Sequence, residues 1–341
     1  MSTGIFVAVY IALLGIFYAL SAYMEKSAAM RGSHRKPMSP WIDKGLRLFF
    51  LTILVSPLCF AIPWTIVLVL LYIPSFIDGS EKRGDRVSAW LTSWRVFHWV
   101  KWYFTLEIVT PHGKLDPKRL YVVAVHPHGF LPLGTLINML SEVNNIREKW
   151  LNGVKLRTLA ASFCFYIPGY RDFCLGGGVI DAARYNAKRA LTNGCSIALV
   201  PGGATEALYA GPGHNTLVLK NRRGFIKLAL EVGADLVPVY SFGENDCYNQ
   251  AASVFPWLKR VQAKFQKVFG LSLPMVTHVI PKPVKITTVM GKPIPVKKVE
   301  NPSDAEVDAL LTLYIEKITE HFYAHCDKYI VDPKHRKLEI L

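Results

Sequence analysis

Two histidines directly follow an apolar run in the first half of the chain, in the tetrapeptide His126-Pro127-His128-Gly129. A neutral imidazole can take a proton from an alcohol near pH 7, because its pKa lies close to that pH. The preceding run, residues 121–125, is short and β-branched, which predicts a strand buried on both faces. Ligands of open α/β sheets bind at the carboxyl ends of such strands. The histidines are therefore candidate general bases, and Gly129 would permit close approach of a substrate.

Two other interpretations of the histidine pair remain open at this point. One histidine can cap the strand end while the other faces solvent. Alternatively, residues two apart on an extended chain can share a metal ion. The chain has no His-Glu-x-x-His, no Cys-x-x-Cys and no carboxylate nearby to complete such a site. The sequence therefore predicts no metal.

A histidine base is usually oriented by a carboxylate, which here must follow one of the other predicted strands. Glu206 follows the apolar run 196–200 and is the best candidate, with Glu244 and Asp246, after the run 236–242, as alternates. A helix first-turn carboxylate, favoured by the helix dipole, explains Glu206 equally well. The amides of the preceding Gly202 and Gly203 are candidate donors to a developing oxyanion.

Three basic residues, Lys220, Arg222 and Arg223, precede a helix predicted from Gly224. Cationic side chains beside a helix N-terminus form a ready site for phosphate. A solvated basic turn would have the same sequence.

The order of elements predicts an α/β fold with a mostly parallel sheet and flanking helices. Strands are expected at 121–125, 156–165, 196–200, 236–242 and 285–296, and helices at 133–143, 181–193, 224–232 and 303–325. The last helix opens with a capping box at Ser303. Residues 254–269 form a basic amphipathic segment, which suits either a membrane surface or a packed helix with solvated lysines.

The N-terminal part, residues 1–78, is predicted to be a membrane anchor. Residues 5–23 carry no charge and are long enough for one span. The apolar stretch 48–77 is divided by Pro57 and Pro63 and is interpreted as a kinked hairpin or re-entrant pair. Basic flanks on both sides of this stretch place residues 79–341 in the cytosol. The alternatives are a cleaved signal peptide at 5–23 and a single span at 48–77 with a lumenal catalytic part.

The composition and net charge of the chain limit the classes of molecule that it is expected to bind. Hydrophobic residues make up 51% of the chain and the net charge is +15, which suits lipid, anionic headgroups and the phosphates of a coenzyme. No helix-turn-helix, RNP or zinc-finger pattern supports nucleic-acid binding. The six cysteines are scattered, which favours a reducing compartment over a disulfide framework.

Three blocks resemble the type-two diacylglycerol acyltransferases, a family with monoacylglycerol and wax-alcohol relatives. They are the tetrapeptide at 126–129, Gly202–Ala207, and above all Asn221–Leu230 continuing into Gly233–Asn245. The resemblance covers roughly residues 94–323. It departs from the family at Thr105, where a proline often follows Tyr-Phe, and in the leading anchor 5–23.

The resemblance implies a glycerolipid acyltransferase-like fold and transfer of a fatty acyl group from acyl-CoA to diacylglycerol. The product would be triacylglycerol, made without a cofactor at the endoplasmic reticulum membrane or the lipid-droplet surface. Plant relatives carry Glu-Pro-His, so the base is placed on His128, and His126 supports it. A monoacylglycerol or long-chain-alcohol acceptor, and a non-catalytic lipid-binding protein, remain alternatives. The sequence leaves the oligomeric state open, and an oligomer is compatible with it.

Overall fold

A computed structural model of the chain describes residues 72–251, 255, 257–269 and 275–341, together with 41, 44, 45, 48 and 70. The predicted span 5–23 and residues 49–69 and 71 of the apolar stretch 48–77 lie outside these residues. Within the described part of the chain, no helix is both long and apolar enough to cross a bilayer. The described residues therefore leave the predicted anchor as an expectation.

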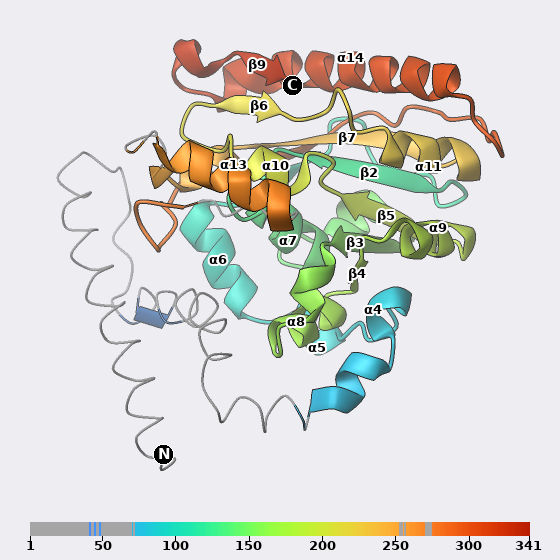
Figure 1. Cartoon of the computed structure of the whole chain (residues 1–341), viewed down its shortest axis with the longest axis horizontal. Helices are drawn as coiled ribbons and strands as arrows, with labels where there is room; N and C mark the ends of the chain where they lie inside the picture. The colour runs from blue at the N-terminus through green and yellow to red at the C-terminus, as the bar shows by residue number, and fades with distance from the viewer. Residues whose placement is uncertain are drawn as a thin grey trace.

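A seven-stranded sheet forms the centre of the fold, in the order β1-β8-β7-β2-β5-β3-β4 (Figure 1). Its strands are β1 Glu107–Val109, β2 Tyr121–His126, β3 Leu156–Ala160, β4 Val179–Asp181, β5 Ser196–Leu199, β7 Asp235–Phe242 and β8 Thr287–Met290. Neighbouring strands are parallel except for β7 and β8, which are antiparallel. A second sheet pairs β6 Asn215–Leu217 with β9 Leu338–Ile340 in parallel. The predicted α/β class with a mostly parallel sheet is confirmed.

The central strand β2 is buried along its whole length. Val122 and Ala124 face one apolar cluster, and Tyr121, Val123 and Val125 face another. This division follows from the two-residue period of a strand, whose side chains point alternately to opposite faces. A strand buried on both faces needs no polar alternation, which explains the uninterrupted apolar run.

Helices cover both faces of the sheet. Those before β5 are α4 Ser80–Arg83, α5 Ala89–Thr92, α6 Val96–Phe104, α7 Leu133–Leu140, α8 Tyr170–Gly176 and α9 Arg184–Thr192, with a π-helix η2 Arg147–Leu151 and a 3₁₀ helix η3 Ser162–Phe165. Those after it are α10 Gly203–Ala207, α11 Gly224–Val232, α13 Trp257–Phe269 and α14 Asp304–Tyr329, with 3₁₀ helices η4 Glu244–Cys247 and η5 Pro333–His335. The long α14 packs on β7, as Figure 1 shows.

Several element boundaries differ from the predicted ones. The run 156–165 is a strand only to Ala160 and then turns into η3. Asp181 ends the unpredicted strand β4 and accepts the Ala183 N–H at 2.7 Å, so it precedes α9 rather than capping it. The capping box at Ser303 is confirmed, although α14 continues past residue 325. The strands β1, β6 and β9 were missed because runs of three residues carry no measurable period.

A buried arginine ties the segment after the apolar stretch to the globular part. Arg171 of α8 is 1% exposed. Its Nη2 donates to Ser75 O at 2.5 Å and to Glu81 Oε2 at 2.8 Å. These bonds fix where the chain enters the described domain.

Candidate active site

The candidate residues lie at or just after the carboxyl ends of three neighbouring strands in the middle of the sheet. The strands β7, β2 and β5 are adjacent and parallel, so their carboxyl ends lie together. His126 ends β2, while α10 with Glu206 follows β5 and η4 with Glu244 follows β7. The candidate residues therefore lie together at the carboxyl ends of neighbouring strands.

His128 is partly buried, and its ring is held by the main chain. Its Nδ1 lies 3.0 Å from the carbonyl oxygen of Gly129. A carbonyl oxygen can only accept, so Nδ1 carries the proton and Nε2 keeps its lone pair. Burial lowers the pKa of His128 below its usual 6.5, against the opposing effect of the Gly129 carbonyl. A neutral ring with a proton-accepting Nε2 is the form that a general base requires.

His126 is in a different environment, although it lies only two residues away. It is 0% exposed and shares the face of β2 that packs against α14, as the alternation of Val122 and Ala124 dictates. Its Nε2 lies 2.8 Å from the Tyr314 hydroxyl. Burial lowers the pKa of His126 to about 3, so the ring is neutral at physiological pH. The geometry suits support of the strand end, not contact with a substrate.

The side chain of Glu206 binds the main-chain N–H of His128. The carboxylate is 1% exposed, and its two oxygens accept from His128 N at 2.6 Å and from Val218 N at 2.9 Å. Burial raises the pKa of Glu206 to about 7, while the two N–H donors and Arg222 oppose this shift. The sequence predicts that this carboxylate orients the imidazole. The carboxylate does lie beside residue 128, but it binds the main-chain N–H and not the ring. The ring is oriented by the Gly129 carbonyl instead.

A loop joins β2 to α7. Glu206 binds its first end at His128, and Glu244 binds its other end, at the start of α7. Its oxygens accept the N–H groups of Leu133 and Gly134, the first two residues of α7, at 2.6 and 2.8 Å. A Cβ at Gly134 would lie 2.6 Å from this carboxylate, so only glycine fits there. The start of α7, where an anionic ligand would be favoured, is therefore occupied by the protein's own carboxylate. Burial raises the pKa of Glu244 to about 8.

The two glycines proposed for the oxyanion differ in availability. Gly203 N already donates to Val200 O at 3.1 Å, so this amide is used within the turn. Gly202 packs directly under the Glu206 carboxylate, and a Cβ there would overlap it. Of this pair, the Gly202 amide is the remaining candidate for an oxyanion donor.

Comparison with known proteins decides the family. The family model described as diacylglycerol acyltransferase matches residues 57–340, most of the chain. The chain belongs to the diacylglycerol acyltransferase family. Diacylglycerol O-acyltransferase 2 of Homo sapiens is 36% identical over 270 residues, covering 74% of this chain and 68% of that protein. Diacylglycerol O-acyltransferase 2 of Xenopus tropicalis is 33% identical over 341 residues, covering 89% of this chain and 91% of that protein.

The chain is also similar to a solved structure. The 1-acyl-sn-glycerophosphate (LPA) acyltransferase PlsC of Thermotoga maritima has a TM-score of 0.41 and 12% identity to this chain. The match covers 92% of this chain and 97% of that one.

The three basic residues proposed for phosphate binding in this family member have separate surroundings. Arg222 donates to Gly202 O and to Thr205 Oγ1, both at 2.9 Å, and so braces the turn under Glu206. Arg223 pairs with Asp304 and Asp308 of α14 at 3.0 and 2.9 Å. Lys220 is exposed and has no ion pair with the described residues. Its ammonium is the most available of the three for a phosphate.

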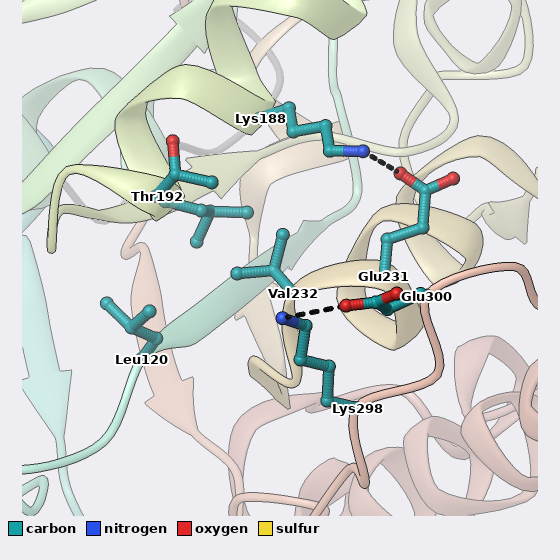
Figure 2. A pocket seen from close by; sticks show the side chains of 8 residues that line it. Leu120, Lys188, Thr192, Glu231, Val232, Lys298 and Glu300 are labelled. Atoms are coloured by element: carbon teal, nitrogen blue, oxygen red, sulfur yellow. Dashed lines mark hydrogen bonds and ion pairs between the residues drawn. The ribbon is translucent and has the colours of Figure 1, made fainter.

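A surface hollow lies near the amino-terminal end of β2, opposite the strand end that carries the histidines. Figure 2 shows the side chains around this space of about 450 Å³, among them Leu120, Lys188, Glu231, Lys298 and Glu300. Leu120 precedes β2, whose ends are roughly 17 Å apart at about 3.3 Å per residue. Lys188 pairs with Glu231 at 3.0 Å and Lys298 with Glu300 at 3.8 Å. The hollow is therefore separate from the histidines.

Two contacts of the site have no signal in the local sequence. Tyr314, the partner of His126, lies 188 positions further along the chain, and Val218, the second donor to Glu206, lies outside the motifs considered. Both enter the site through tertiary packing. Neither residue type at its position suggests a role in chemistry.

Proposed function

We propose that this chain transfers a fatty acyl group from acyl-CoA to the free hydroxyl of diacylglycerol, with His128 as the general base. The observation that carries the proposal is the 3.0 Å contact between His128 Nδ1 and Gly129 O, from which the tautomer of the ring follows. Because Gly129 O accepts from Nδ1, Nε2 of the neutral ring keeps its lone pair, and the residue lies partly buried just after the strand end. The names of the matched relatives support the choice of diacylglycerol as acceptor.

The reaction requires no covalent acyl-enzyme, because a thioester is already activated. His128 Nε2 removes the proton from the acceptor hydroxyl, whose oxygen attacks the thioester carbonyl. The carbon–oxygen bond forms, the carbon–sulfur bond breaks, and the imidazolium returns its proton to the departing CoA thiolate. General base catalysis contributes about 10²–10⁴-fold to such a step. We assign the Gly202 amide to the developing oxyanion and Lys220 to a phosphate of the coenzyme.

We propose further that the reaction takes place at the endoplasmic reticulum membrane or the lipid-droplet surface, with the described domain facing the cytosol. Two observations support a lipid surface. The apolar stretches 5–23 and 48–77 precede the domain directly. In addition, Trp90 of α5 is 69% exposed, and Trp99 and Trp102 of α6 are 43% and 45% exposed. Exposed tryptophans are typical of the membrane interface.

The test is acyl transfer by membranes that contain the full chain, with labelled acyl-CoA and either diacylglycerol, monoacylglycerol or a long-chain alcohol. The proposal predicts triacylglycerol as the main product. It also predicts that His128→Ala abolishes transfer while the protein stays in the membrane fraction. His112→Ala, in the exposed loop between β1 and β2, is the matched control and should keep full activity.

Each of the other outcomes of this acyl-transfer test would contradict a different part of the proposal. A preference for another acceptor would keep the chemistry and change the substrate. Transfer by His128→Ala at the wild-type rate would remove this residue from the mechanism. No transfer with any acceptor would favour a lipid-binding protein without catalysis.

A further inference from the structure

The short strand β6 leads directly to the residue that holds Glu206. Val218 follows β6 and donates its N–H to Glu206 Oε2 at 2.9 Å, while Oε1 accepts from His128 N at 2.6 Å. One carboxylate thus links two segments 90 positions apart. The placement of His128 therefore depends on where β6 holds Val218.

The residues on both sides of Val218 are bound by Leu341, the residue that directly follows β9. Leu341 N donates to Leu217 O at 2.8 Å, and Leu219 N donates to Leu341 O at 2.9 Å. Consecutive backbone groups of an extended chain point to opposite edges. Since residues 217 and 219 face β9, the N–H of Val218 faces the other edge, where Glu206 lies.

The strand β9 is in turn anchored to the main core. Leu338 is 9% exposed and belongs to the same apolar cluster as Tyr314 of α14. Thr216 Oγ1 of β6 also donates to Glu339 Oε2 at 3.1 Å. Figure 1 shows β9 and β6 on the side of the sheet where α14 lies. A two-stranded pair is marginally stable alone, so this anchoring is what fixes β6.

We propose that β9 is a positioning element of the active site, which holds Val218 so that Glu206 can fix the main chain of His128. This inference rests on the proposed function, because it assigns β9 to the same reaction. The strand contacts neither the imidazole nor a reacting atom, so its effect is on the position of the base. A displacement of a catalytic group by about 1 Å can reduce turnover by about 100-fold.

Two variants of the full chain test the proposal. Leu341→Pro removes the N–H that binds Leu217 O, and proline keeps the preceding residue extended. Leu341→Ala keeps this N–H and is its matched control. Deletion of residues 338–341 is the stronger change, although it also removes Leu338 from the core. We expect Leu341→Pro to lower kcat about 10- to 100-fold with little change in the KM for acyl-CoA.

A double-mutant cycle separates positioning from a general loss of structure. If β9 acts through Glu206, Leu341→Pro should lower kcat little further in a Glu206→Gln background. In a Glu244→Gln background it should lower kcat by the same factor as in the wild type, because Glu244 holds the other end of the loop. Equal factors in all three backgrounds would overturn the proposal.

Hydrogen exchange provides a readout that is independent of activity. Of residues 128–131, all of them described, only His128 donates its N–H in a hydrogen bond. Exchange in the segment 127–132 should therefore rise in Leu341→Pro and stay at the wild-type level in Leu341→Ala. This result would support the role of β9 even if no acyl transfer were found for the wild type. Unchanged exchange, or unfolding of both Leu341→Pro and the deletion variant, would overturn it.

Discussion

Glu206 binds the main chain of His128 and not its ring: Oε1 accepts the His128 N–H at 2.6 Å, while the imidazole donates to Gly129 O at 3.0 Å. In a Ser-His-Asp triad the carboxylate stabilises the imidazolium directly. Here the carboxylate sets the position of the residue, and a neutral carbonyl sets the tautomer. Four predictions follow from this separation of roles and from the burial of the groups around it.

Glu206→Gln should lower kcat and remove the titration of Glu206, whose pKa is about 7, from the pH profile, while the acidic limb that belongs to His128 stays below 6.5. Glutamine offers one carbonyl oxygen to two N–H donors, so either His128 N or Val218 N would face its NH₂ group. Leaving one buried donor unsatisfied costs about 1–3 kcal/mol. Rate measurements from pH 5 to 8 check this. A shift in the midpoint of the acidic limb would mean that Glu206 acts on the imidazolium after all.

His126→Ala should reduce stability more than His128→Ala does. The ring of His126 is 0% exposed and bonds to Tyr314, so its removal leaves a cavity and reduces the Tyr314 hydroxyl to its 3.4 Å bond to Ala124 O. We expect a loss of about 2–4 kcal/mol in the free energy of unfolding. For the partly exposed His128 the loss should be under about 1 kcal/mol. Denaturation of the two variants in detergent measures both, and equal losses would contradict the assignment.

The activity should fall at acidic pH with a midpoint below 6.5, the ordinary pKa of histidine. Burial disfavours the imidazolium and lowers the pKa of His128, so the ring stays neutral to lower pH. Transfer needs the neutral ring and is lost as pH falls through this lowered pKa. The pH profile of kcat/KM for acyl-CoA tests the sign. Because Glu206 titrates near 7, the profile of Glu206→Gln isolates the ring, and a midpoint above 6.5 in that variant would indicate a carboxylate beside the ring.

Glu244 should make the protein less stable as pH rises. Its pKa is about 8 in the folded protein and 4.5 when unperturbed, so the folded state retains the proton more strongly. The stability from this group is complete below 4.5 and is lost as pH rises through 8. The loss is on the order of a few kcal/mol. Thermal unfolding of the wild type and Glu244→Gln between pH 5 and 8 should show a steeper decline for the wild type.

A matched variant controls the pH effect. Glu148→Gln, on the exposed surface of η2, should decline in parallel with the wild type. The stability of Glu244→Gln could also decline in parallel with that of the wild type. In that case the two N–H donors to wild-type Glu244 outweigh the effect of its burial, and the carboxylate is charged throughout this pH range.

The sequence by itself determined the elements whose signal is local. The β-branched run at β2, the helix α11 ending at Gly233, and the capping box at Ser303 were all placed correctly, because a few adjacent residues set the preferred backbone conformation. The position of the histidines at a strand end follows from the same local pattern. The family blocks added the expectation of acyl transfer.

Only the tertiary structure decided which atoms meet. The contact of Glu206 with the main chain of residue 128, the Tyr314 hydroxyl beside His126, and the pairing of β6 with β9 join residues 78 to 188 positions apart. The antiparallel placement of β8 beside β7 is of the same kind. Such contacts depend on register and on the packing of distant elements, and the period of a single segment contains no information about either.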